Sequence, residues 1–460
     1  MKKTMLSVSL VCAMAVTALA GCGSSGGSAA TTAAPAPAQT ETQAAADAQE
    51  ASSEAADAEE EITLTIGSAM MTEDPEGAVE QEIANRYMAE HPNVKIEFIS
   101  MPATEVSKRV VTQAVSGDLP DMFFVPNDFM PQLNDMGIVA DLESVLGEEY
   151  LAGYNPNLLE DAKVQGKMVT VPVYASPYAV IYRTDWFEEL GLTPPTTWDE
   201  FLEVARKLTR DTDGDGKVDK WAFSMVGTRN NSGEQRFILI SKSFGADEIY
   251  QDGNGEWKTD LGTDQFKDAL TYFTDLYVKE GVVPPGPVEV DYSASMELFT
   301  GEQTGMILSG PHSLGFITKQ NPNLEGKLGS FVIPKGAEHV SISGLGGYTI
   351  MESCEHKDVA ADYLKFFTNK ENALYFAENT GRMPVRLESA DAPLFSSDLF
   401  KGFLEAMDYC VPTETFTSYT ALLDAVGEAY SNILAGSSTV DEAMVVLNEK
   451  AESIIAEAGN

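Results

Sequence analysis

Hydrophobic and polar positions repeat with two different periods in the part of the chain that begins near residue 62. Residues 62–66 and 94–98 alternate between apolar and polar side chains, which predicts two half-buried strands. Between them, Val79, Ile83 and Tyr87 recur at a spacing of four, which predicts a helix with one apolar face. The two periods follow each other along the chain, so strands and helices are expected to alternate.

The same alternation continues and then restarts. A helix around residues 106–114 leads into the apolar run 122–125, which completes the order strand–helix–strand–helix–strand. This order is typical of an α/β sheet with parallel strands and right-handed crossovers. A second α/β region begins near Val171, and its clearest helix starts at Thr197, with Glu200 in the position of a capping box. We therefore expect an α/β fold with two regions.

Composition excludes several classes of function. The chain has 460 residues, and 30 Lys and Arg stand against 71 Asp and Glu, a net charge of −41. Neither a nucleic acid backbone nor an anionic lipid surface attracts such a protein directly. The four cysteines form no C-x-x-C pair and the four histidines are scattered, which argues against a structural zinc site or haem attachment.

The first sixty-one residues differ from the rest. Two lysines precede an apolar run that ends in Leu-Ala-Gly-Cys at Cys22, so residues 1–21 are interpreted as a signal peptide. The ending resembles a bacterial lipobox, which implies cleavage before Cys22 and lipidation of that residue; the alternative is a secreted protein with an incidental cysteine. Residues 22–61 lack aromatic and branched aliphatic side chains and are interpreted as a disordered tether. The predicted location is the outer face of the bacterial cytoplasmic membrane.

A family resemblance runs in order from about Ile62 to the C terminus. Its segments are the following: Gly166–Tyr174, Ile181–Phe187, Pro194–Phe201, Leu298–Pro311, Gly346–Gly347 and Thr380–Pro384. Together they resemble the extracellular solute-binding proteins of family 1, the sugar-type receptors of ATP-binding-cassette importers, similar to maltose-binding protein.

The resemblance implies a two-lobe periplasmic-binding-protein-like fold of type II, with three crossovers between the lobes and the ligand between them. The implied first lobe comprises residues 62–173 and 342–408. The second comprises residues 174–341 and 409–460. This arrangement agrees with the general rule that ligands of open α/β sheets bind beyond the carboxyl ends of the strands.

Candidate ligand-binding residues follow from the resemblance, position by position. Asn127 and Asp128 follow the run 122–125, where the family often places an acidic acceptor for sugar hydroxyls; a turn that caps the next helix explains them equally well. His312 stands where many members have tryptophan. Arg236 is a further candidate, and an arginine there could bind a carboxylate or phosphate, which keeps an acidic sugar open.

Three more positions complete the implied binding site. Gly347 and Tyr348 belong to the Gly-Gly-Tyr segment, and Tyr419 lies near the last crossover. Either tyrosine could stack on a pyranose ring, and either could simply pack in a core.

A loop rich in aspartate carries the clearest metal pattern. Asp211, Asp213, Asp215 and Asp219 occupy positions 1, 3, 5 and 9 of an EF-hand-like loop with glycine at position 6, but position 12 is Ala222. Two interpretations stay open: a structural calcium site, or an Asp- and Gly-rich turn. No other cofactor is expected.

The predicted function is a lipid-anchored, monomeric receptor that captures a carbohydrate by hinge closure and delivers it to the permease of an importer, without catalysis. Two alternatives remain: a secreted lipoprotein enzyme such as a glycosidase, and a receptor of the same fold for a non-sugar solute or a sensor kinase. Cys354 and Cys410 would be exported together, and the sequence leaves open whether they form a disulfide.

Overall fold

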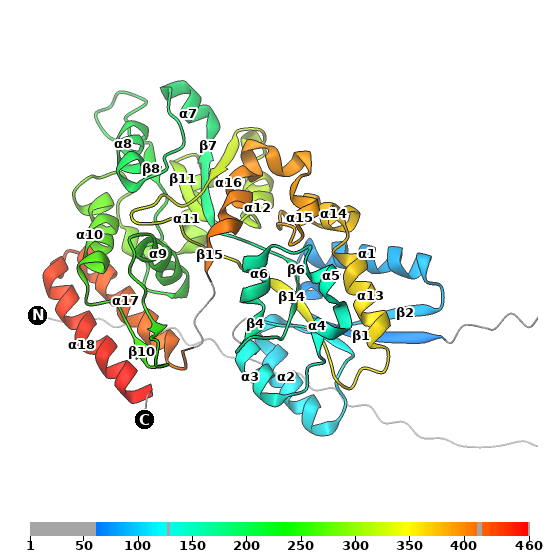
Figure 1. The fold of residues 1–460 in the computed structure, drawn as a ribbon. Coiled ribbons are helices and arrows are strands. Elements are labelled where there is room, and N and C mark those ends of the chain that lie inside the picture. Colours follow the sequence, from blue (N-terminus) through cyan, green and yellow to red (C-terminus); the bar gives the residue numbers. More distant parts are fainter. Residues whose placement is uncertain (1–60, 127–128, 412–415, 459–460) are drawn as a thin grey trace, which may run out of the picture. The chain divides into compact units, whose positions relative to one another are not determined.

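The computed structural model describes residues 61–126, 129–411 and 416–458 (Figure 1). The predicted signal peptide, Cys22 and the tether up to residue 60 lie outside these ranges, and so do Asn127 and Asp128. No helix within the described ranges is both long enough and apolar enough to cross a membrane.

The first sheet has the strand order β2–β1–β3–β14–β6. Its strands are β1 (Ile62–Ser68), β2 (Val94–Ser100), β3 (Met122–Phe124), β14 (Gly346–Ile350) and β6 (Val171–Tyr174). The strands β1, β2 and β3 are parallel, as the alternating pattern predicts. The sheet as a whole is mixed, because β14 runs antiparallel to both β3 and β6. The local pattern could not predict β14, which comes from more than two hundred residues further along the chain.

Helices cover the first sheet with the apolar faces that the sequence predicts. α1 (Glu76–Glu90) buries Val79, Ile83 and Tyr87 and contacts α13 (Lys357–Phe367) and α14 (Lys370–Thr380). α2 (Ala103–Ser116) ends at Gly117, whose left-handed backbone closes the helix. Figure 1 shows α13 and α14 beside α1, although their sequences lie far from it.

The second sheet has the order β12–β7–β11–β8. Its strands are β7 (Ala179–Arg183), β8 (Trp221–Phe223), β11 (Thr304–Ser309) and β12 (Leu328–Phe331). β7 is antiparallel to both of its neighbours, whereas β11 and β8 are parallel. Both faces of β7 are buried, since Val180 and Tyr182 join one hydrophobic cluster and Ala179 and Ile181 the other.

The main helices of the second lobe include α8 (Trp198–Leu208), which packs on β8, and four helices that pack on one another. These four are α9 (Asn231–Ser243), α10 (Asp264–Val278), α17 (Tyr419–Leu434) and α18 (Val440–Ala458). The predicted capping box at the start of α8 is confirmed, because Thr197 accepts from the Glu200 amide and the Glu200 carboxylate accepts from the Thr197 amide.

Shorter elements complete the described part of the chain. The helices are α3 (Met130–Met136), α4 (Leu142–Leu146), α5 (Glu148–Leu151), α6 (Pro156–Asp161), α7 (Thr184–Leu190), α11 (Tyr292–Thr300), α12 (Ser313–Gln320) and α15 (Leu387–Ala390). The two-stranded pairs are β4 (Lys163–Val164) with β5 (Lys167–Met168), β9 (Tyr250–Gln251) with β10 (Trp257–Lys258), and β13 (Ser341–Ile342) with β15 (Cys410–Val411).

The two-lobe fold with three crossovers is confirmed. The chain leaves the first sheet after β6 and enters the second at β7, and it returns from β13 into β14. β15 pairs in parallel with β13, and Phe416, the next described residue, already belongs to the core of the second lobe.

The segment 342–408 does not belong to the first lobe as one block. Its last helix, α16 (Asp398–Ala406), lies on β12 of the second sheet. The Ser330 hydroxyl on β12 donates to the Leu399 carbonyl at 2.8 Å and accepts from the Gly402 amide at 3.0 Å. A Cβ atom on Gly402 would lie 2.3 Å from the Phe331 nitrogen, so the helix approaches the strand too closely for any other residue. The helix α16 thus lies on the second sheet, while its buried Phe400 and Phe403 belong to the same hydrophobic cluster as the strands of the first sheet.

Candidate functional site

Polar and aromatic side chains from four segments meet where the two lobes join. Ser176 and Tyr178 lie between β6 and β7, Arg236 lies on α9, Tyr292 begins α11, and His312 follows β11. They are linked by hydrogen bonds and ring contacts, given below, and we call these five residues the junction cluster. All but Arg236 come from the end of an element or from a connection, which is where open α/β sheets place ligand-binding groups.

Arg236 is the most buried charge in the junction cluster, with 6% of its surface exposed. Its Nε donates to the Leu308 carbonyl at 3.0 Å, and its Nη1 donates to the carbonyl and the hydroxyl of Ser232. The guanidinium lies 4.3 Å from the ring centre of Tyr292 and 5.2 Å from that of Tyr178. These contacts fix the guanidinium between two aromatic rings.

His312 contacts the β6–β7 connection and α11 through its ring nitrogens. Nδ1 is hydrogen-bonded to the Ser176 hydroxyl at 3.0 Å, and Nε2 lies 3.5 Å from the Tyr292 hydroxyl. Burial, together with the positive charges of Arg382 and Arg236, lowers the pKa of His312 to about 3. The imidazole is therefore neutral at physiological pH and offers one donor and one acceptor.

Arg382 approaches His312 from the first lobe. It follows α14, donates to the Glu76 carboxylate at 3.0 Å, and lies 4.8 Å from the ring centre of Tyr174. The preceding Gly381 has a left-handed backbone, and a Cβ atom there would lie 2.6 Å from the Pro311 carbonyl oxygen. This close approach brings the first lobe against the turn that carries His312.

This arrangement suits recognition of a polar solute. Rings supply flat apolar faces, while serine, tyrosine and histidine groups supply neutral donors and acceptors. The described residues of the junction cluster contain an arginine and a neutral histidine but no carboxylate.

Three other predicted ligand-binding residues, Gly347, Tyr348 and Tyr419, lie outside the junction cluster. Tyr348 is 1% exposed, and its hydroxyl is hydrogen-bonded to Glu80 and Ser68. Its ring packs in the core of the first lobe and is not at a surface, so the expectation that it stacks on a sugar has no support here. Gly347 allows β14 to pack closely against β6, because a Cβ atom at this position would lie 2.6 Å from the Val171 carbonyl oxygen. The register of this strand pair shifts between Gly346 and Gly347.

Tyr419 lines a different pocket, in the second lobe beside the strands β13 and β15. Its hydroxyl donates to Glu248 at 2.8 Å, and Glu248 also pairs with Lys242 at 2.8 Å. Of the predicted ligand-binding residues within the described ranges, Arg236 and His312 are thus the two that share the junction cluster.

Sequence reasoning missed Ser176, Tyr178, Tyr292 and Arg382. Ser176 and Tyr178 lie close to the first predicted change of lobe, between residues 173 and 174. Arg382 lies inside the segment Thr380–Pro384. The family resemblance thus included the neighbourhoods of these residues but did not single them out as ligand-binding residues. Tyr292 had no signal, because it is one of sixteen tyrosines and begins an ordinary helix.

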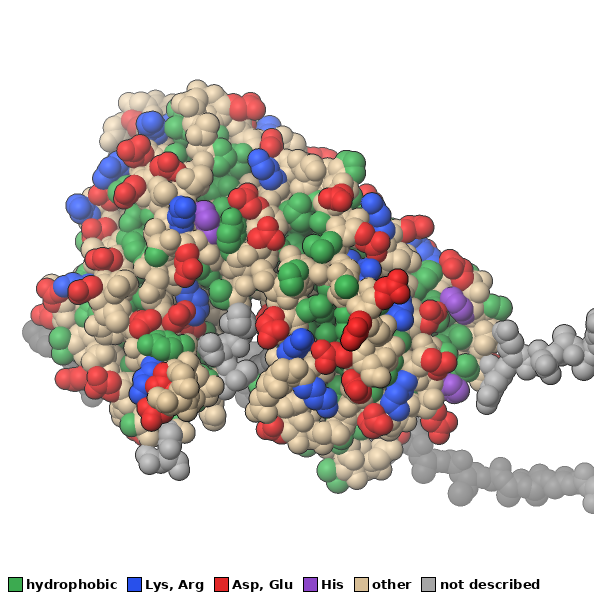
Figure 2. All heavy atoms as spheres, in the orientation of Figure 1, with side chains coloured by type: hydrophobic (Ala, Val, Ile, Leu, Met, Phe, Trp, Pro, Cys, Tyr) green, Lys and Arg blue, Asp and Glu red, His purple; other side chains and the backbone are tan. Residues whose placement is uncertain are grey.

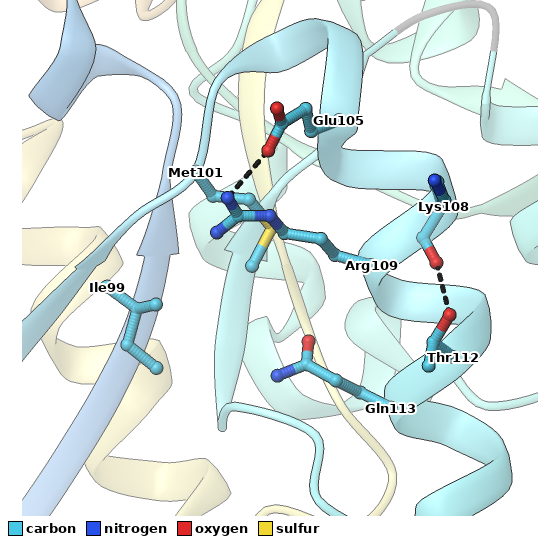
Figure 3. A pocket seen from close by; sticks show the side chains of 7 residues that line it. All are labelled: Ile99, Met101, Glu105, Lys108, Arg109, Thr112 and Gln113. Atoms are coloured by element: carbon cyan, nitrogen blue, oxygen red, sulfur yellow. Dashed lines mark hydrogen bonds and ion pairs between the residues drawn. The ribbon is translucent and has the colours of Figure 1, made fainter. Parts of the chain in front are cut away.

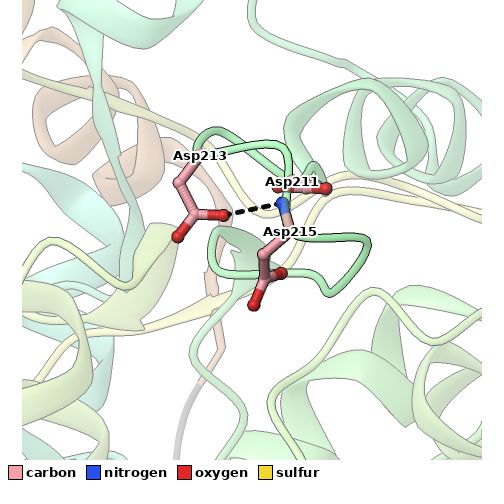
Figure 4. Close-up of side chains that lie close together, drawn as sticks. All are labelled: Asp211, Asp213 and Asp215. Atoms are coloured by element: carbon pink, nitrogen blue, oxygen red, sulfur yellow. Dashed lines mark hydrogen bonds between the residues drawn. The ribbon is translucent and has the colours of Figure 1, made fainter.

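The aspartate-rich loop holds three of its four expected carboxylates together (Figure 4). One oxygen from each of Asp211, Asp213 and Asp215 lies within 4.8 Å of the others, and all three residues are exposed. Asp219 is not part of this group, because its two oxygens accept from the amide and the hydroxyl of Thr212 at 2.9 and 2.5 Å. Ala222 lies inside β8, so the twelfth loop position cannot supply a ligand.

A surface hollow of about 410 Å³ lies between the end of β2 and α2 (Figure 3). Its lining includes Ile99 and Met101 on one side and Arg109 on the other. Arg109 is already paired with Glu105 at 2.6 Å and Lys108 is exposed to solvent, so this hollow presents no buried charge comparable to that of Arg236.

Cys354 and Cys410 are both free thiols. Burial raises the pKa of each thiol to about 12, which keeps both protonated and unreactive. The sequence left open whether Cys354 and Cys410 form a disulfide, and in the structure they do not.

Comparison with known families gives one match that covers most of the chain. Residues 72–374 match the family described as bacterial extracellular solute-binding protein. Among curated relatives, the lactose-binding protein of Rhizobium radiobacter is 22% identical over 401 residues, which span 81% of this chain and 89% of the relative. The maltotriose-binding protein of Pyrococcus abyssi is 24% identical over 367 residues, 78% and 75% of the two chains.

Solved structures agree on the fold. The sugar-binding protein of Xanthomonas citri superposes with a TM-score of 0.72 at 20% identity and covers 86% of this chain and 98% of its own. The cyclic α-maltosyl-1,6-maltose-binding protein of Arthrobacter globiformis gives a TM-score of 0.69 at 22% identity, with coverages of 86% and 99%.

Proposed function

Because the chain belongs to the bacterial extracellular solute-binding protein family, we propose that it captures a carbohydrate at the junction cluster for an ATP-binding-cassette importer. The observation that carries this proposal is the cluster itself. Two tyrosine rings, a neutral histidine and a serine hydroxyl converge on one place, and a sugar presents C–H faces and hydroxyls that match them. Relatives named for lactose and maltotriose support the choice of solute class.

The mechanism that we propose is hinge closure. A solute that touches Tyr292 of the second lobe and Arg382 of the first favours the state in which the lobes are closest. That closed state would then be the one that docks on the permease. Binding and release complete this cycle, and no covalent step is required of the protein.

We further propose that the receptor is anchored outside the cell by lipid on Cys22. The Leu-Ala-Gly-Cys sequence supports this. In a bacterial host, Cys22→Ala is expected to move the protein from the membrane fraction to the soluble exported fraction. A variant protein that stays with the membrane after a salt wash contradicts the anchor.

The test of solute binding is a thermal-unfolding screen of the full chain over mono- and oligosaccharides, followed by calorimetry. A ligand at one hundred times its dissociation constant adds about 2.7 kcal/mol of stability. Tyr292→Ala should weaken binding roughly tenfold, about 1.4 kcal/mol, through loss of one ring face and one hydroxyl. Tyr250→Ala, in the remote pair β9–β10, is the control that should keep the affinity.

Two results would refute the proposal. If no saccharide shifts the unfolding temperature, the solute class is wrong. If oligosaccharides come back cleaved after incubation, the protein is a glycosidase rather than a receptor.

A further inference from the structure

Arg236 differs from the other buried arginines of the second lobe and the junction in lacking an anionic partner. Arg183, with 2% of its side chain exposed, pairs with Asp185 and Glu302 at 2.7 and 2.9 Å. Arg382 pairs with Glu76 at 3.0 Å. Within the described ranges, Arg236 pairs with no carboxylate, and its charge meets only carbonyl oxygens, one hydroxyl and two rings.

The hydrogen-bonding capacity of Arg236 is also incomplete. A guanidinium carries five N–H groups. Nε–H and the two N–H groups of Nη1 are used, whereas Nη2 has no hydrogen-bond partner in the described part of the chain. The nearest acid on the same helix, Glu234, lies on another side of α9. Its Oε1 is next to Gly427 of α17, and the charge of Arg229 acts to lower its pKa.

A buried cation without a counter-charge lowers the stability of the folded protein. Such a cation is therefore usually retained where an anionic partner or ligand pairs with it. The described surroundings do not neutralise Arg236, since the histidine beside it is held uncharged and the carboxylate of Glu76 is already paired with Arg382. The two rings keep the guanidinium plane fixed, which prepares it to receive an acceptor in a defined direction.

Building on the carbohydrate receptor proposed above, we propose that the solute is an anionic saccharide whose negatively charged group accepts hydrogen bonds from Nη2 of Arg236. A carboxylate, as in a uronic acid, and a phosphate ester share this chemistry. The charge of −41 on the whole chain does not oppose such binding, because charges beyond about 8 Å are screened at physiological ionic strength, whereas Arg236 would touch the ligand. On the face shown in Figure 2, acidic and basic side chains are interspersed, without a single acidic field.

The experiment compares matched pairs of ligands on the full chain by calorimetry. Each pair consists of a neutral sugar and its acid: glucose and glucuronate, galactose and galacturonate, mannose and mannuronate, as mono- and disaccharides. The methyl ester of each uronate and the corresponding hexose phosphate are added. In at least one series, we expect the uronate or the phosphate to bind at least tenfold more tightly than both the neutral sugar and the ester. The tighter of the two anions then identifies the charged group.

Variants assign the preference to Arg236. Arg236→Gln should remove the tenfold preference and change the affinity for the neutral sugar less than threefold. Arg236→Lys, which keeps the charge but not the fork, should retain part of the preference. The control is Arg206→Gln, a surface arginine paired with Glu280, which should leave both affinities unchanged. If Arg236→Gln does not fold, the wild type still decides, because 1 M NaCl should weaken the anion and spare the neutral sugar.

The outcomes separate this inference from the proposed function. If neutral sugars bind as tightly as their acids and phosphates in every series that binds, the anionic ligand is wrong and the carbohydrate receptor stands. If no member of any series binds, the proposed function fails together with the inference. If Arg236→Gln keeps the full preference for the anion, Arg236 is not the group that recognises it.

Discussion

Glu80 makes the stability of the first lobe depend on pH in a direction opposite to that of most carboxylates. It is fully buried on α1, where the Ser68 hydroxyl donates to it at 2.6 Å and Tyr348 forms a second hydrogen bond. Burial raises the pKa of Glu80 from 4.5 to about 7, although both hydrogen bonds act to lower it. The ionisable groups that interact with Glu80 are the tyrosines 174, 348 and 363, with no cation among them.

The sign and size of the effect follow from proton linkage. Between pH 4.5 and about 7 the folded protein keeps the proton of Glu80, while the unfolded chain has lost it. The unfolded state therefore binds fewer protons, and stability falls as the pH rises through this window. A difference of about 2.5 pH units, at about 1.4 kcal/mol each, corresponds to roughly 3 kcal/mol lost between acidic and neutral conditions.

The perturbation that tests this is Glu80→Gln, which removes the ionisation and keeps a donor and an acceptor for the two hydroxyls. Urea unfolding at pH 5 and pH 8 should show the variant gaining about 3 kcal/mol on the wild type between the two values. Glu234, whose pKa burial also raises to about 7, contributes equally to both proteins and cancels. Glu82→Gln, on the exposed side of the same helix, is the control that should track the wild type. A constant difference between Glu80→Gln and the wild type at all pH values would refute the reasoning.

Two further predictions concern packing and metal. Gly402→Ala should destabilise the protein by about 2 kcal/mol or more in urea unfolding, because its Cβ would meet the backbone of Phe331 at 2.3 Å; unchanged stability would mean that α16 can move away from β12. Millimolar calcium should raise the unfolding temperature of the wild type and not that of Asp215→Asn, because three carboxylates within 4.8 Å repel one another until a cation joins them. No shift in either protein would leave the aspartate-rich loop as a turn.

The elements that the sequence predicted well are those whose signal is local. The helix α1 and the capping box of α8 depend on side chains three or four residues apart, and the spacing alone revealed them. The antiparallel insertion of β14 and the position of α16 on β12 depend on contacts between distant segments. Their periodicity is the same whichever lobe receives them, so only the tertiary structure could place them.

The binding residues show the same division. Arg236 and His312 were predicted from the family resemblance, and the structure brings both of them to Tyr292. For Tyr348 the sequence left two roles open, because an aromatic residue after two glycines is equally compatible with a ligand site and with a core, and the structure places its ring in the core. Its burial, together with its bond to Glu80, was invisible in the sequence, since Glu80 lies 268 residues away.

The junction cluster also explains why a solute bound there would act on both lobes. Arg236 donates to the Leu308 carbonyl of β11, and Arg382 donates to Glu76 of α1. Each arginine is therefore fixed to one lobe and moves with it. The positive charges of both arginines act on His312 and help to lower its pKa. An anion that accepts hydrogen bonds from both arginines would favour the arrangement in which the lobes are nearest. The same contacts between the anion and the arginines would then both recognise the charge and stabilise the closed state. Replacing Arg236 would therefore weaken binding of the anion and closure of the hinge together.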